Sequence, residues 1–460
     1  MKRRTFGLLA GTSFLALKAG AVKAQTAPDP SLLTTTLTPL GAERAGNADG
    51  SIPPWTGGLT SLPPGLKPND YVPELFPEEK PVLVIDSSNM AQYSDRLSEG
   101  VMNLMQKYGF SIKVYPTHRT ASAPQYVYDN TAKNAVNAKL YPGGGRFGFE
   151  GAYGGVPFPI PDVSVPLNAG TQIVWNHNAK WTGYEYLIDL SGYAVTDGQL
   201  ENSFSAHTRY RNPFYDPQGS LATFNGLIQQ VEVPYYAPAA LVGQDLIIFS
   251  YTDPFQHPQQ AWELLNGQGR VRRAPEISFD TPSSQADGIA NYDEEFGFNG
   301  SLERYDWHYL GKKEMYIPYN NNGLFGAEPQ AAHLPHFLDP NLVRWELHRC
   351  WVVEATLHPG ERNVLARRKL YIDEDTWIAG AIDAWDGNDN LYKLNIVYNN
   401  CRPDLPGVVY ANNCEHNLQT GDYVSNSGAW DQKEKSTFLF VDNIPLSDYD
   451  PAHMAASAQY

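Results

Sequence analysis

The sequence predicts an α+β protein dominated by one strongly curved antiparallel sheet. The clearest part of that sheet is a run of four strands over residues 349–398, joined by short polar turns that are typical of an antiparallel meander. Apolar residues recur at helical spacing in an earlier segment, residues 88–108, and no fixed-period internal repeat is present. Antiparallel strands accompanied by separate helices favour the α+β class.

The first 24 residues are expected to be a signal peptide. Basic residues at positions 2–4 precede an apolar run at 6–17, and small residues at 22–24 offer a cleavage site. The apolar run is shorter than the ~18–20 residues that span a bilayer. Positions 3–6 (Arg-Arg-Thr-Phe) resemble the twin-arginine export motif, and an ordinary secretory signal is the alternative. Both routes predict a mature chain in the bacterial periplasm.

The charge of the mature chain excludes some partners. The sequence has 34 basic and 50 acidic residues, and removing the signal removes five basic ones, so the mature net charge is 29 − 50 = −21. Phosphate backbones repel such a chain, so nucleic acid is not expected as a partner. No later apolar stretch is long enough for a transmembrane segment.

The mature chain is expected to begin with an extended arm, followed by helices. Residues 25–85 are rich in Pro and Gly, which prevents regular structure, and Trp55 is expected to anchor this arm. A helix is predicted from Ser88 or Asn89 to Gly109, and a weaker helix over 125–140. A short strand at 111–115 separates them.

Sheet-forming patterns dominate from about residue 170. The domain organisation is predicted as a single large domain over 86–400, with its helical part at 88–140, and a loop-rich C-terminal tail over 401–460. The predicted strands are Tyr184–Val195, Leu246–Tyr251, Trp351–Leu357, Val364–Ile372, Trp377–Ala384 and Leu391–Val397.

Three cysteines are present, at positions 350, 401 and 414. In an oxidising compartment a disulfide is predicted between Cys401 and Cys414, because the chain between them is rich in turn residues. The alternative is two unpaired loop thiols. Cys350 stands in an apolar strand and is expected to be a buried small hydrophobe.

Catalytic motifs are not found in the sequence. His333, His336 and Asp339 match no established zinc spacing, so two surface-loop histidines are the favoured interpretation. Carboxylates at 373–375 lie in a predicted tight turn, where Asp is favoured for local hydrogen bonding. There is no nucleophile elbow, phosphate loop or dinucleotide fingerprint. An enzyme is therefore not expected, and no cofactor or metal is predicted.

The aromatic content of 12%, with 10 Trp and 28 Tyr, suggests two roles. Tyr305, Trp307 and Tyr309 share one face of a predicted strand, and Trp175 and Trp181 form a second group in the sequence. Ordinary core packing in a large sheet is one interpretation. Lining of an apolar ligand cavity is the other, because flat rings offer contact area without fixing orientation.

Arg272 and Arg273 form a compact basic pair in the predicted sheet region. Alternation sends one arginine to each face of the sheet. Pairing with the abundant carboxylates is the favoured role, and contact with an anionic headgroup is the alternative.

Several blocks of the sequence resemble a bacterial family of unknown function that is labelled outer-membrane lipoprotein-sorting-like. The blocks extend over nearly the whole mature chain. They are Leu37–Asn47, Val114–Thr120, Glu150–Pro161, Arg270–Pro275, Gly311–Tyr316 and Trp351–Leu357. The family is similar to the Lol lipoprotein carriers, and the resemblance implies a half-barrel sheet closed by helices around a hydrophobic cavity. It also implies a lipid-like ligand and an exporter of the resistance-nodulation-division class as partner, but no catalytic residues.

Two functions follow as hypotheses. The first is a periplasmic carrier of a hydrophobic molecule or lipid, with Trp175, Trp181, Tyr305, Trp307, Tyr309, Arg272 and Arg273 as candidate ligand-binding residues. The alternative is a carbohydrate-binding or carbohydrate-active protein that uses Trp and Tyr rings as sugar platforms. An enclosed apolar cavity would favour the first, whereas an open groove with exposed rings would favour the second.

Overall fold

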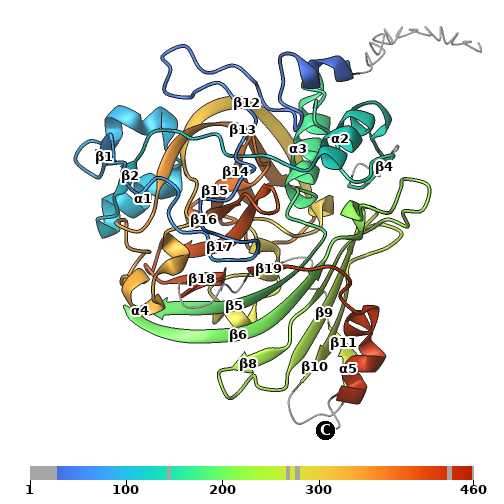
Figure 1. Cartoon of the computed structure of the whole chain (residues 1–460). Coiled ribbons are helices and arrows are strands. Elements are labelled where there is room, and N and C mark those ends of the chain that lie inside the picture. The colour runs from blue at the N-terminus through green and yellow to red at the C-terminus, as the bar shows by residue number, and fades with distance from the viewer. Residues whose placement is uncertain (1–27, 142–146, 266–269, 275–279, 433–437, 458–460) are drawn as a thin grey trace, which may run out of the picture.

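The computed structural model describes residues 28–141, 147–265, 270–274, 280–432 and 438–457 (Figure 1). The predicted signal peptide, residues 1–24, lies outside the described residues. The described chain forms a 17-stranded sheet, a two-stranded sheet and α-helices that lie around them. This arrangement confirms the α+β class and the dominance of one large sheet.

The main strands of the large sheet form one antiparallel series. Their order is β12–β13–β14–β15–β16–β17–β18–β5–β6–β7–β9–β10–β11. Their bounds are β5 (Glu185–Thr196), β6 (Gln199–Arg211), β7 (Leu227–Glu232), β9 (Asp245–Tyr251), β10 (Gln260–Leu264), β11 (Val271–Arg273), β12 (Tyr305–Pro318), β13 (Trp345–Leu357), β14 (Arg367–Asp373), β15 (Ala379–Trp385), β16 (Leu391–Arg402), β17 (Gly407–Asn417) and β18 (Tyr423–Gly428).

Shorter strands complete the two sheets. Within the large sheet, β8 (Tyr235–Ala237) pairs with β6, and β19 (Phe438–Phe440) pairs with β5. A further pair, β1 (Leu83–Ile85) and β2 (Ile112–Val114), joins β13 through one parallel contact of Val114 with Trp345. The separate sheet consists of β3 (Lys139–Leu140) and β4 (Phe149–Glu150).

The predicted meander is confirmed as β13 to β16, with antiparallel pairing at each step. The segments predicted at 184–195 and 246–251 are β5 and β9. The prediction of a loop-rich tail over 401–460 is wrong, because β17 and β18 lie inside the sheet and β18 pairs with β5. The turn residues Pro403, Pro406 and Gly407, which lie between the two cysteines, occupy only the turn between β16 and β17 and its exit.

The register of β16 and β17 contradicts the predicted disulfide. Cys401 lies opposite Val408, and Cys414 lies six positions further along, opposite Ile396. Six strand residues correspond to about 20 Å, whereas bridged cysteines have Cα atoms about 4–7 Å apart. Both thiols are free and buried. Cys350 is also buried, as predicted.

Helices are present in the predicted helical part, but the first predicted helix, from Ser88 or Asn89 to Gly109, is divided into two segments. A 3-10 segment over 90–96 ends before Ser98, whose side chain accepts a hydrogen bond from Val101 N and starts α1. Gly109 ends α1 in the left-handed region, with φ of 74°. The helices are α1 (Glu99–Tyr108), α2 (Gln125–Asn137), α3 (Pro166–Asn178), α4 (Pro329–Ala332) and α5 (Pro451–Ser457). The 3-10 helices are η1 (Pro30–Thr34), η2 (Met90–Arg96), η3 (Pro213–Tyr215), η4 (Ser284–Ala286), η5 (Tyr292–Glu294), η6 (Leu302–Arg304), η7 (Leu324–Gly326) and η8 (Leu446–Tyr449).

Helix α3 was not predicted, because this segment was assigned to the start of the sheet region. Pro166 stands at the first turn of α3, where its missing N–H costs nothing. The helix packs on β12 so closely that a Cβ at Gly170 would lie 2.2 Å from the Trp307 carbonyl oxygen. Figure 1 shows α3 beside β12 and β13. None of the helices in the described ranges is both long and apolar enough to span a membrane.

The arm before the first strand contains the short 3-10 helix η1 and otherwise mainly turns, bends and irregular backbone. Trp55 is half-buried, and its indole N–H donates to the Ala121 carbonyl at 2.9 Å. The guanidinium of Arg44 lies over the same ring, 5.1 Å from its centroid. The ring therefore ties the arm to the chain between β2 and α2.

Candidate ligand cavity

Three adjoining chambers lie between the β5–β9 part of the sheet and the segment that precedes β12. The first chamber has a volume of about 100 Å³, the second about 40 Å³ and the third about 310 Å³. Gln229 of β7 and Asn299 line all three chambers, so the chambers meet at this pair. We call the three together the cavity.

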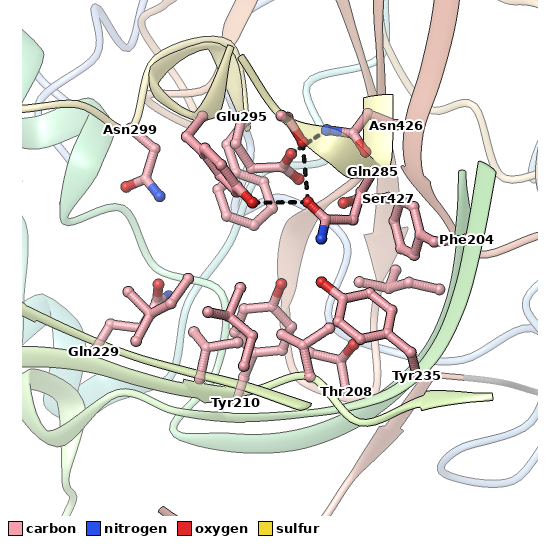
Figure 2. A pocket seen from close by; sticks show the side chains of 18 of the residues that line it. Phe204, Thr208, Tyr210, Gln229, Tyr235, Gln285, Glu295, Asn299, Asn426 and Ser427 are labelled. Carbon is pink, nitrogen blue, oxygen red and sulfur yellow. Dashed lines mark hydrogen bonds between the residues drawn. The ribbon is translucent and has the colours of Figure 1, made fainter. Parts of the chain in front are cut away.

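The first chamber has a mainly apolar floor, which also includes Thr208 and Gln229, and a mainly polar roof (Figure 2). Strands β6, β7 and β9 supply the floor, because alternate side chains of each strand point to the same face. The floor residues include Phe204, Tyr210, Val231, Val233, Leu246 and Ile248. The roof comes from residues 283–299 and from β18, and includes Gln285, Glu295, Asn299, Asn426 and Ser427.

Glu295 is the ionisable group of this roof. Burial raises the pKa of its carboxyl to about 7, and a hydrogen bond with Ser427 offsets only part of that effect. One carboxyl oxygen accepts from Asn426, and the other is buried without a hydrogen-bond partner. Near neutral pH a large fraction of this carboxyl is protonated, so the roof presents hydrogen-bonding groups with little fixed charge.

The second chamber is lined by aromatic rings and one lysine. Phe296 separates it from the first chamber and lines both. The backbone of Phe296 has φ of 56°, which is rare for a bulky residue. Its ring packs on Tyr410 with centroids 4.3 Å apart, and Lys180 Nζ lies 5.7 Å from the centroid of the same ring.

The third chamber has the largest volume of the three and opens beside an apolar loop. Its wall includes Trp175 of α3 and Ile228 of β7. Pro254, Phe255 and Pro258 contribute from the loop that follows β9. Phe255 is 84% exposed, so the mouth of the cavity presents a hydrophobic ring to solvent.

The structure does not bring the seven predicted ligand-binding residues together. Trp175 lines the third chamber, but its position in α3 contradicts the expected strand. Trp181 packs between Tyr126 and Tyr215, and the buried Tyr305 and Trp307 belong to the core beneath α3. Tyr309 packs against the same core cluster, whereas Arg272 and Arg273 lie in β11, outside it. Tyr309 packs on Trp351, Arg272 pairs with Glu263 at 2.7 Å, and Arg273 lies over the Trp262 ring.

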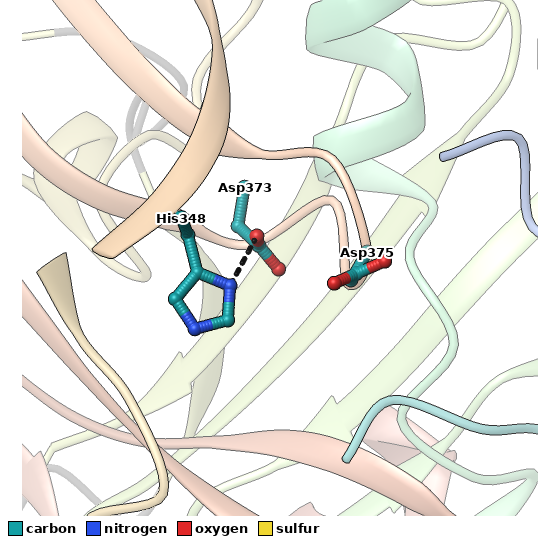
Figure 3. A group of neighbouring side chains, drawn as sticks. All are labelled: His348, Asp373 and Asp375. Atoms are coloured by element: carbon teal, nitrogen blue, oxygen red, sulfur yellow. Dashed lines mark ion pairs between the residues drawn. The ribbon is translucent and has the colours of Figure 1, made fainter. Parts of the chain in front are cut away.

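A second candidate site is a buried group of His348, Asp373 and Asp375 (Figure 3). These side chains offer ligand atoms within 4.8 Å of one another, which is close enough for one metal ion. Each is already paired, however. Asp375 receives two hydrogen bonds from Arg119, at 2.7 and 2.8 Å. His348 uses one ring nitrogen toward Asp373, at 3.3 Å, and the other toward Glu346, at 3.2 Å.

Further charges continue this group into a salt-bridge network. Glu374 lies 2.7 Å from Lys312 Nζ and 3.0 Å from Arg349 Nη1. Arg119 also donates to backbone carbonyls of the arm, including that of Glu43 at 2.7 Å. The carboxylates at 373–375, which were predicted to form local hydrogen bonds in a turn, therefore also take part in this network. Asp373 does accept from Thr376 within the turn, but the group as a whole fastens the arm to the sheet.

The protonation of His348 predicts a pH-dependent stability. Burial lowers its pKa, but hydrogen bonds with Asp373 and Glu346 outweigh burial and raise it to about 9. Between pH 6.5 and pH 9, the folded state keeps a proton on His348 that the unfolded state has lost. The contribution of this proton to the unfolding free energy is therefore complete below pH 6.5 and disappears as the pH rises through 9. We expect the unfolding free energy of wild type, relative to His348→Gln, to fall by about 3 kcal/mol from pH 6 to pH 9.5. Denaturant titrations at both pH values check this, and an unchanged difference would contradict it.

The other predicted metal candidates do not form a cluster. His333 Nδ1 contacts the Pro329 carbonyl, and His336 Nδ1 contacts the Gly421 carbonyl. Asp339 accepts from the Asn341 backbone in its own turn. Each of the three thus has a backbone partner. The interpretation as two surface-loop histidines is wrong for His333, which is buried, whereas His336 is half-buried.

Comparison with known proteins places the chain in a family. Residues 84–454 match the family described as "Protein of unknown function (DUF1329)". The chain belongs to this family. The resemblance seen in the sequence blocks is therefore confirmed. An uncharacterized protein of Pseudomonas aeruginosa, PA3922, is 34% identical over 466 residues, which cover 98% of both chains.

Three solved structures are also similar. A DUF1329 family protein from Desulfovibrio piger shares 14% identity at a TM-score of 0.43, over 63% of this chain and 99% of that one. A putative outer membrane lipoprotein-sorting protein domain from Vibrio parahaemolyticus shares 11% identity at a TM-score of 0.42, over 62% of this chain and 97% of that one. A LolA superfamily protein from Nitrosomonas europaea, NE2245, shares 9% identity at a TM-score of 0.35, over 62% of this chain and 98% of that one.

The residues that line the cavity were mostly missed from the sequence. Gln229, Asn299 and Lys180 belong to no motif, and they meet only because β7, the segment before β12 and the end of α3 converge. Phe296-Gly297 carried a weak signal, since glycine after a bulky residue marks an irregular backbone. Both residues have positive φ here.

Proposed function

We propose that this protein is a periplasmic carrier that holds a lipid-like or other hydrophobic ligand in the cavity without changing it chemically. The observation that carries the proposal is the meeting of three chambers at Gln229 and Asn299, of which the first and third are lined mainly by apolar surface. Pockets lined by apolar and aromatic side chains with a few polar groups are typical of sites for small hydrophobic ligands. A role as an accessory to an exporter of the resistance-nodulation-division class stays a prediction from the family resemblance.

The proposal includes a half-barrel form for the sheet, in which strands several places apart face each other. Two strands separate β12 from β15, yet a Cβ at Gly380 in β15 would lie 2.5 Å from Ile317 Cγ2 in β12. Just beyond β12, Asn321 N donates to the Asn399 carbonyl of β16 at 2.9 Å. Such contacts support a sheet that curves back on itself.

The exposure of the tryptophans favours a hydrophobic ligand over a carbohydrate. Sugar platforms need flat rings that face solvent, whereas eight of the ten Trp residues are buried. The other two are Trp55 and Trp262, which are half-buried and stack with Arg44 and Arg273. One face of each of these two rings therefore carries a guanidinium group.

Binding of a neutral hydrophobic fluorophore tests the proposal. We expect delipidated protein to bind N-phenyl-1-naphthylamine saturably at one site, with a Kd in the micromolar range, about −8 kcal/mol. The measurement is a fluorescence titration, with lipids, sterols and oligosaccharides as competitors. Displacement by lipids or sterols would support the carrier. Saturable binding of oligosaccharides alone would reject it.

A further inference from the structure

We infer that the second chamber binds the anionic headgroup, a carboxylate or a phosphate, of an amphipathic ligand whose hydrocarbon part occupies the adjoining chambers. This inference rests on the proposed carrier function and names the class of its ligand. The group that would recognise the anion is Lys180, whose side chain lines the second chamber just beyond the end of α3.

Lys180 has donors to spare. Its Nζ donates to the His177 carbonyl at 2.9 Å, which satisfies one carbonyl at the end of α3. An ammonium group has three donors, so two remain for a ligand. Within the described part of the chain, no carboxylate lies within ion-pair distance of Lys180, and none lines the second chamber.

The surroundings of Lys180 leave its charge without compensation. Burial alone lowers the pKa of its amine to about 7. The acid of the cavity roof, Glu295, lies in the first chamber and is hydrogen-bonded to Asn426. An anion beside Lys180 would restore the charged amine, because an opposite charge favours the ionised form.

Neutral polar groups and aromatic rings complete the chamber. Asn178 and Thr182 flank Lys180 in the chain and line the chamber with it, and the Asn178 Oδ1 atom is buried without a hydrogen-bond partner. Tyr186 and Phe438, which also line the chamber, stack with ring centroids 5.0 Å apart. The chamber thus offers one cation and neutral amides to an otherwise apolar ligand.

A matched pair of fluorescent ligands tests the inference. We expect wild type to bind cis-parinaric acid about tenfold more tightly than its uncharged methyl ester, since a charge-assisted hydrogen bond is present only with the acid. Lys180→Met should weaken binding of the acid about tenfold and leave the ester and N-phenyl-1-naphthylamine within about twofold. Lys133→Met, which removes an exposed lysine of α2, should change none of the three affinities.

The outcomes separate this inference from the carrier function. Equal affinities of wild type for acid and ester, or equal losses of both in Lys180→Met, would overturn the headgroup site while the carrier stands. Failure of wild type to bind any of the three probes would overturn both. Competition with hexadecanoate and hexadecyl phosphate identifies the source, because the stronger competitor shows whether a carboxylate or a phosphate is preferred.

Discussion

Asn299→Trp is expected to weaken binding of N-phenyl-1-naphthylamine at least about 100-fold, or about 3 kcal/mol. Asn299 lines all three chambers, and its side chain makes no hydrogen bond with the described residues. An indole at this position would fill the junction without removing an interaction that holds the fold. The measurement is a fluorescence titration of the delipidated variant, together with a thermal melt.

Two control variants isolate the effect of blocking the junction. Asn299→Ala removes the amide but adds no volume, so its affinity should stay within about threefold of wild type. Leu446→Trp adds a ring at a position that is 61% exposed and outside the cavity lining, and it should bind as wild type does. Normal binding by a folded Asn299→Trp variant would contradict the location of the site.

Asp375→Ala is expected to lower the unfolding free energy by about 3–5 kcal/mol, because it leaves the buried Arg119 without its main partner. Both side chains are at most 3% exposed, and two hydrogen bonds join them. The next carboxylate, that of Glu374, lies 3.6 Å from Arg119. Chemical denaturation followed by circular dichroism gives the change.

A pair on the surface and a double variant serve as comparisons. Glu263→Ala breaks the exposed pair with Arg272 and should cost less than about 1 kcal/mol. Arg119→Met combined with Asp375→Leu should recover part of the loss, because no buried charge then lacks a partner. A cost for Asp375→Ala no larger than that for Glu263→Ala would contradict the structural role of the network.

The sequence predicted those parts of the fold that are determined by local pattern. The meander at 349–398 alternates and carries turn residues at each end, so its strands follow from neighbours along the chain. Helix α3 was missed because nine of its 13 residues are buried and it has only a weak apolar face. The segment after Cys401 was wrongly predicted as a loop-rich tail, because prolines that occupy only one turn suggested irregular structure. The strand that follows, β17, is buried by its neighbours in the sheet, which the local sequence does not reveal.

The candidate site was less predictable because it is built from distant segments. Trp175 was predicted as a ligand-binding residue because aromatic rings often line cavities, and it lines the third chamber. Lys180, five residues later, carries no pattern that distinguishes it from a surface lysine. Likewise, Asp373 to Asp375 fit a turn in the sequence, and only the structure brings Arg119 and His348 to them from other elements.

The most direct test of the central claim is a crystal structure of delipidated protein saturated with a bromine-labelled fatty acid. Anomalous scattering locates the bromine independently of the placement of the rest of the ligand. The proposed function predicts a bromine peak inside the cavity, within contact distance of residues such as Trp175, Ile228 or Val231. A saturated complex whose bromine peaks all lie outside the three chambers would contradict it.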